Sequence, residues 1–116
     1  MSSSKATHYF EAALYNTGDA KQAVLFTAHI VVSEVSSALE AGVDLYILYE
    51  LATEWGIKKQ YLPRKTNDVT EWRTQILHDP EGVLDIPNSK CIEQHLPKHR
   101  RPTVEEIREA LRACRE

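Results

Sequence analysis

The sequence predicts an all-α protein, a compact bundle of four to five helices in a single domain spanning residues 1–116. Apolar residues recur at helical spacing in several segments, and cap residues precede these segments while Gly or Pro follows them. Hydrophobic residues make up 42% and charged residues 27% of the chain, as in ordinary globular proteins. A chain of 116 residues can bury a core without metal or disulfide support.

The first half of the chain predicts two helices separated by Gly18. After a frayed tail at residues 1–4, apolar residues of the segment 5–16 fall on one side of a helix. Asp19 is placed as the cap of a second helix over 20–41, which ends before Gly42. A strand is the alternative here, because β-branched residues are frequent; we favour a helix, since the segment far exceeds the about 5–6 residues of a typical strand.

A third helix is predicted over residues 45–55, with Asp44 as its cap. Apolar residues cover most of its circumference, which is typical of a deeply buried helix or of one that binds a partner. Tyr46 and Tyr49 are the candidates for the solvent-facing or partner-facing side. We expect this helix to form an antiparallel pair with the preceding one, covered by the remaining helices.

The second half predicts a fourth helix and a final helix joined by an irregular connection. The fourth begins near Asp68, with Glu71 at the reciprocal capping position. Residues 83–102 are punctuated by prolines, and only 89–96 have room for a short helical turn. Thr103 and Glu106 form a capping box that opens an amphipathic final helix containing Val104, Ile107, Leu111 and Cys114.

Charge and cysteine content predict a cytoplasmic, soluble protein. The net charge is −3, with an acidic half before residue 57 and a slightly basic half after it. The two cysteines, Cys91 and Cys114, stand far apart in no known framework, so reduced thiols are expected. We find no signal peptide and no apolar run of the about 20 residues that cross a bilayer, and therefore expect no membrane contact.

The segment 45–65 resembles the core of a helix-turn-helix motif. Ala52, Gly56, Ile57 and Leu62 fall where that motif has small, turn-forming and apolar residues. The resemblance implies DNA binding, and the basic and polar side chains that would contact nucleic acid are Lys58, Lys59, Gln60, Arg64 and Lys65. Pro63 departs from the pattern, because it would fall inside the recognition helix.

Three further groups of residues carry weaker signals of metal or phosphate binding. Cys91, His95 and His99, with Cys114, have the residue types of a zinc site, although Pro97 interrupts the helix that would align them. His29 with His78 and Asp79 is similar to the ligand set of HD-type phosphohydrolases, which would make the chain a metal-dependent enzyme. Arg100 and Arg101 belong to a basic run that is suited to phosphate contacts.

These observations predict a small non-enzymatic regulator or inhibitor that binds a macromolecular partner through an aromatic helical surface and a basic loop. The partner-binding residues would be Tyr46, Tyr49, Lys58, Lys59, Arg64 and Lys65. A protein partner is favoured, a homodimer is compatible with the same surface, and DNA binding is the alternative. No catalytic motif is recognised, and neither a cofactor nor a metal is expected.

Overall fold

The computed structural model describes residues 4–115, and all side chains among them except those of residues 66–68. Within these residues the chain forms seven α-helices, one 3-10 turn and no strand, so the all-α prediction is confirmed although the helix count is higher than expected. The elements are α1 (Lys5–Thr17), α2 (Ala20–Glu40), α3 (Leu45–Trp55), the 3-10 turn η1 (Lys59–Tyr61), α4 (Thr66–His78), α5 (Pro80–Val83), α6 (Ser89–His95) and α7 (Val104–Ala113).

The second and third helices begin directly after the caps predicted for them, whereas the cap of α1 was not predicted. Ser4 caps α1 by accepting a hydrogen bond from the Thr7 amide, so this residue of the predicted frayed tail has a defined role. Residues 1–3 of that tail lie outside the described part of the chain. Asp19 and Asp44 cap α2 and α3 in the same way. The helical prediction for residues 20–41 is therefore confirmed over the strand alternative.

The connection predicted to be irregular contains more helix than expected. Asp79 caps a single helical turn, α5, and Asn88 caps α6, which fills the predicted space at residues 89–96. The capping box of α7 has both of its hydrogen bonds, as predicted. For α4, the proposed Asp68 cap lies outside the described side chains, and the helix begins two residues earlier, at Thr66.

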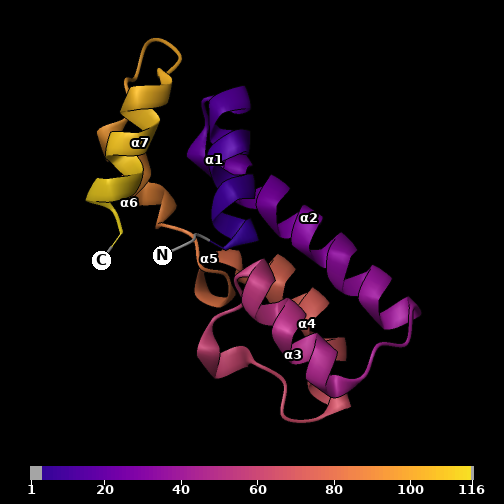
Figure 1. Ribbon diagram of the computed structural model, residues 1–116. Coiled ribbons are helices and arrows are strands. Elements are labelled where there is room, and N and C mark those ends of the chain that lie inside the picture. Colours follow the sequence, from indigo (N-terminus) through magenta and orange to yellow (C-terminus); the bar gives the residue numbers. More distant parts are fainter. Residues whose placement is uncertain (1–3, 116) are drawn as a thin grey trace.

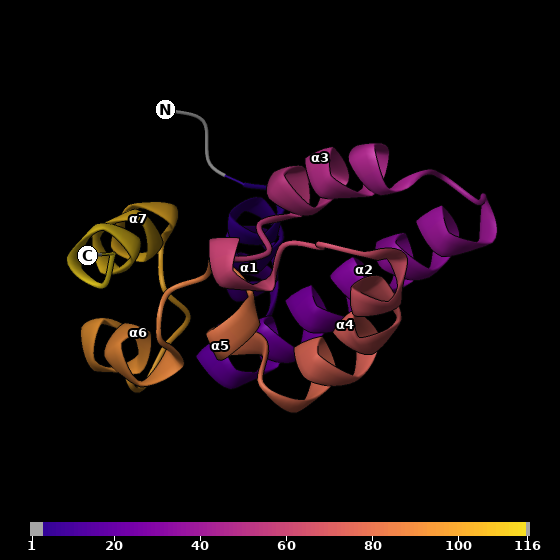
Figure 2. The same cartoon turned by 90° about the horizontal axis from the view of Figure 1, so that it is seen from below.

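The helices do not pack in the predicted order. α2 packs mainly against α1 and α4, while α6 packs against α7 and α2 (Figures 1 and 2). α3 is not among the helices that α2 contacts closely, so the expected antiparallel pair of α2 and α3 is wrong. The reason lies in α3 itself, which directs Trp55 toward Trp72 of α4 and its C-terminus toward the start of α1.

One continuous apolar core contains residues from every α-helix. Its largest fully buried side chains include Phe10, Leu48, Trp72, Ile92 and Ile107. The molecule is elongated, with principal extents of 46, 24 and 19 Å, and the pair α6 and α7 lies at the end away from the α2–α3 turn (Figure 1).

The prediction that no apolar segment is long enough to cross a bilayer does not hold for α2. Among the described residues, it is long and apolar enough to cross a membrane by length and composition alone. Core helices of soluble proteins have the same features, and α2 buries a stripe that includes Val24, Ala28, Val31 and Val35 against its neighbours. The burial of this stripe in an apolar core shared by all the α-helices indicates a soluble protein, whereas a cytoplasmic location stays a prediction.

Candidate functional site

Tyr46, the most exposed aromatic side chain of the described residues, lies on the outward side of α3 together with Tyr49. Tyr46, Ile47 and Tyr49 are 72%, 42% and 47% exposed, and Glu50 lies among them at helical spacing. We call these four residues the α3 outer face. Ile47 was not predicted as a member; its signal was the stripe of buried residues on the opposite side of α3, which leaves position 47 at the edge of the open side.

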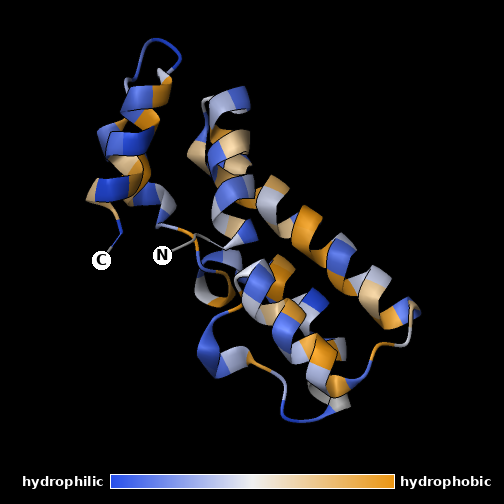
Figure 3. Cartoon of the chain, viewed as in Figure 1, coloured by the Kyte–Doolittle hydropathy of each residue, from blue (hydrophilic) through white to orange (hydrophobic). Residues whose placement is uncertain are grey.

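The opposite side of α3 holds this helix in place. Leu48, Ala52 and Trp55 are buried, and the Trp55 ring meets the Trp72 ring edge to face at a centroid distance of 6.5 Å. Apolar colour is prominent along both α2 and α3 in Figure 3. The α3 outer face therefore sits on a helix whose inner side is anchored in the core.

Electrostatics give the α3 outer face an acidic character. The neighbouring Glu50 carboxylate, one helical turn after Tyr46, raises the pKa of the Tyr46 hydroxyl. Glu54 is also exposed, one turn after Glu50. The face thus combines apolar and aromatic atoms with an acidic edge.

The basic segment after α3 does not form a recognition helix. Residues 59–61 make a single 3-10 turn, Pro63 is buried in the following loop, and α4 begins only at Thr66. The compact turn between two helices that defines a helix-turn-helix is therefore missing from segment 45–65. Pro63 is the physical reason, since it cannot occupy a helix interior.

The predicted contact residues of this segment have different surroundings. The Lys58 side-chain ammonium donates a hydrogen bond to the Glu81 carbonyl at 3.0 Å, and the backbone amide of Lys58 donates one to the Val83 carbonyl. Lys58 therefore has a structural role. Lys59 is exposed on η1. The other three predicted contact residues line a hollow of about 530 Å³ between this segment and α4. They are Gln60, Arg64 and Lys65.

The two arginines that were proposed to contact phosphate form hydrogen bonds within the chain instead. Arg100 donates two hydrogen bonds to the Glu106 carboxylate, at 2.7 and 2.8 Å, and Arg101 donates to the Asn16 carbonyl near the end of α1. Arg100 holds the pKa of Glu106 at about 2, with help from the Thr103 amide. Both guanidinium groups thereby organise the approach to α7.

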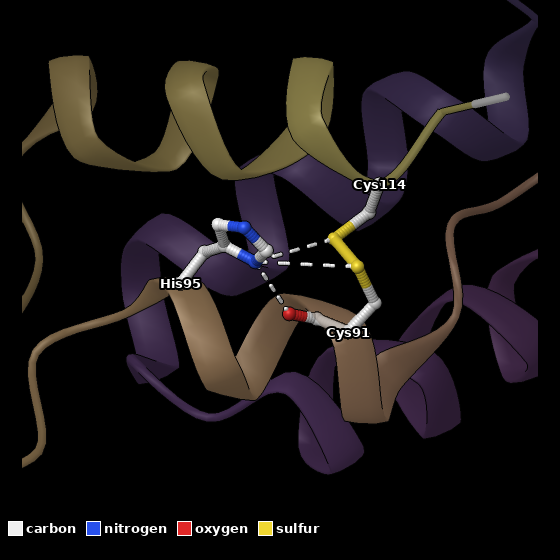
Figure 4. Close-up of side chains that lie close together, drawn as sticks. All are labelled: Cys91, His95 and Cys114. Carbon is white, nitrogen blue, oxygen red and sulfur yellow. Dashed lines mark hydrogen bonds between the residues drawn. A yellow bond between two sulfur atoms is a disulfide. The ribbon is translucent and has the colours of Figure 1, made fainter.

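The structure joins the two cysteines that were expected to be reduced. Cys91 of α6 and Cys114 at the end of α7 form a disulfide with their Cα atoms 5.9 Å apart, which corrects the prediction of free thiols (Figure 4). The loop 96–103 turns the chain back so that α6 and α7 lie side by side, a relation that a separation of 23 residues does not reveal. Disulfides persist in oxidising compartments and are rare in the cytosol, so this disulfide counts against the predicted cytoplasmic location.

His95 completes a three-residue cluster with this disulfide. Its Nδ1 atom lies 3.7 Å from the Cys114 sulfur and 4.0 Å from the Cys91 sulfur (Figure 4). Three of the four residues grouped for zinc are therefore together, while His99 stays outside the cluster. Within the described part of the chain this is the only such group, so His29, His78 and Asp79 do not assemble the phosphohydrolase ligand set; Asp79 caps α5 instead.

A groove that was not predicted lies between α1 and α7. It encloses about 270 Å³ and is mainly apolar, with exposed Tyr15 and Val104 at its sides; its lining residues are His8, Glu11, Ala12, Tyr15, Val104 and Ile107. The long spacing between α1 and α7 in the chain hides this groove from local patterns.

Comparison of the chain with protein-family models, with curated proteins and with solved structures finds no match.

Proposed function

We propose that this chain is a non-enzymatic interaction protein that binds another protein through the α3 outer face. The observation that carries the proposal is the exposure of Tyr46, Ile47 and Tyr49 on a helix whose other side is anchored by Trp55. Tyrosine supplies a large contact area at low cost in conformational entropy and is enriched at protein interfaces. A role as regulator or inhibitor follows if the bound partner has an activity to modulate.

Charge narrows the kind of partner. Glu50 and Glu54 place two negative charges along the α3 outer face, and Lys59 lies in the adjoining turn. A complementary surface has an apolar centre with basic side chains at its edge. Two copies of the chain meeting through this face would bring like charges together, so a different protein is favoured over a homodimer.

The test compares the proteins retained by three forms of the full chain. Immobilised wild type, the double variant Tyr46→Ala/Tyr49→Ala and the control Tyr15→Ala are exposed to the same lysate, and retained proteins are quantified by mass spectrometry. Tyr15 is the matched control, because it is a tyrosine on α1 whose exposed fraction, 53%, lies between those of Tyr46 and Tyr49. We expect at least one protein to be retained by wild type and by the control. The double variant should retain more than about tenfold less of it, because it lacks two tyrosines of the interface.

The purified partner then allows a direct measurement. Binding of the double variant should be weaker, and Glu54→Lys should slow association with a basic-edged partner at low salt. Identical sets of retained proteins for all three forms, with no change of oligomeric state in sedimentation, would rule the proposal out.

A further inference from the structure

We propose that, once its disulfide is reduced, this chain binds a zinc ion through the Cys91 and Cys114 thiolates and His95. Thiolate sulfur and imidazole nitrogen are the ligands that zinc prefers in proteins. The inference is independent of the α3 outer face, because the cluster lies on α6 and α7 at another part of the molecule (Figure 1).

The three side chains come from two helices that pack side by side. Cys91 and His95 are one helical turn apart on α6, and Cys114 caps α7, which packs against α6. One ligand atom from each residue falls within 4.8 Å of the other two. The neighbouring core side chains Ile92, Ile107 and Leu111 are buried, so the helices that carry the ligands are fixed by packing as well as by the disulfide.

The distances fit zinc after a small change. Zinc bonds of about 2.3 Å to sulfur and about 2.0 Å to nitrogen in a tetrahedron place sulfur and nitrogen roughly 3.6 Å apart. The nitrogen of His95 lies 3.7 and 4.0 Å from the two sulfur atoms. The sulfur atoms must separate, which cleavage of their bond permits, to the roughly 3.8 Å expected for two thiolates on one tetrahedral ion, and the imidazole must turn from the Cys91 carbonyl toward the ion.

The imidazole can change between a hydrogen-bond donor and a ligand. In the disulfide form Nδ1 lies 2.9 Å from the Cys91 carbonyl, which can only accept, so this nitrogen carries the proton. Moving that proton to Nε2 and turning the ring away from the carbonyl oxygen directs the Nδ1 lone pair at an ion held between the two separated sulfur atoms. Neutral imidazole in this tautomer is an ordinary zinc ligand.

The complete change balances as reduction followed by proton release. A two-electron reductant and two protons convert the disulfide into two thiols; a phosphine does this by taking oxygen from water and becoming a phosphine oxide. Zinc then displaces both thiol protons and binds the two thiolates and the imidazole. Three protein ligands leave the fourth position for water, and the half-buried sulfur atoms and exposed imidazole are reachable from solvent.

The test measures zinc in the full chain with and without a phosphine reductant. Protein is equilibrated with zinc under each condition, freed of unbound metal, and assayed by elemental mass spectrometry. We expect about one zinc per reduced chain and essentially none per oxidised chain. Cobalt(II) in place of zinc should add the absorption of thiolate-to-cobalt charge transfer to the reduced form alone.

Two histidine variants assign the nitrogen ligand. His95→Ala should weaken zinc binding by the reduced chain by more than about tenfold, since even the loss of an outer partner of a ligand costs at least that much. His99→Ala is the matched control, a histidine four residues away and outside the cluster, and should bind as wild type does. A reduced wild-type chain without zinc, or equal affinities of the two variants, would overturn the proposal.

Circular dichroism keeps the test decisive if reduction loosens the fold. In that case zinc should restore the helical signal of the reduced wild type and should do so less well for His95→Ala. Failure of zinc to restore it would count against the site as directly as a missing metal signal.

Discussion

Gly56 is the residue on which the placement of α3 most depends. It follows α3 with a φ of 96°, in the left-handed region that disfavours other residues. A Cβ atom at this position would lie 2.5 Å from the Ser4 hydroxyl and 3.0 Å from the Ala6 Cβ. Ser4 caps α1, so one substitution would disturb both the end of α3 and the beginning of α1.

We therefore expect Gly56→Ala to lower the free energy of unfolding by roughly 2–3 kcal/mol, from backbone strain plus the collision with Ser4. Gly42→Ala is the matched control: its φ is 68°, but no atom lies within 4 Å of the added Cβ. That variant should lose only about 1–2 kcal/mol. Urea titration measures both, and equal losses would show that the contact with α1 contributes nothing.

At the scale of the element, the start of α7 is stabilised in a pH-dependent way. Arg100 first, and the Thr103 amide next, lower the pKa of Glu106 from 4.5 to about 2. A carboxyl with a lowered pKa in the folded state adds stability above its unfolded pKa and loses it as the pH falls through the folded value. This contribution should be complete above about pH 5 and should disappear as the pH falls to about 2.

Replacement of Arg100 isolates this effect. Arg100→Ala should raise the pKa of Glu106 toward 4.5, which NMR titration of the side-chain carboxyl measures directly. The difference in the free energy of unfolding between wild type and variant should then shrink as the pH falls from about 5 to about 2, because Glu106 becomes protonated in both proteins. Arg112→Ala, which removes an arginine that pairs with Glu109 instead, should leave the Glu106 pKa unchanged. A Glu106 pKa that stays near 2 in Arg100→Ala would contradict the assignment.

The elements also show which parts of the structure a single sequence can predict. Asp19, Asp44 and Thr103 were correctly assigned as caps, because a cap bonds to backbone only two or three residues away. The departure of α3 from α2 was not predicted, since it depends on the contact of Trp55 with Trp72, seventeen residues further along. Patterns within one helix indicate which side is apolar but not which neighbour covers that side.

The candidate sites follow the same division. Tyr46 and Tyr49 could be assigned to the open side of α3 from helical spacing alone, and the structure exposes both. Lys58 could not be distinguished from the other basic residues, because its bond to the Glu81 carbonyl joins distant segments. The pairing of Cys91 with Cys114 was likewise missed, since it depends on how α6 and α7 turn back on one another.

At the scale of the whole molecule, the disulfide closes the end formed by α6 and α7. This pair meets the remainder of the structure through α1 and α2, and buried side chains at the contact include Ile92 and Ile107. Packing alone should keep the two helices associated when the cysteines are reduced. The disulfide adds to this by restricting the unfolded chain, in which Cys91 and Cys114 would otherwise separate freely.

Reduction should therefore destabilise the protein without abolishing its fold. For two cysteines 23 residues apart, the restriction of the unfolded chain corresponds to about 3 kcal/mol. Urea titrations with and without a phosphine reductant, both in the presence of a chelator to exclude zinc, should differ by about this amount. The double variant Cys91→Ser/Cys114→Ser should match the reduced chain and be insensitive to reductant. Coinciding wild-type transitions with thiols shown to be free would contradict the expected stabilisation through restriction of the unfolded chain.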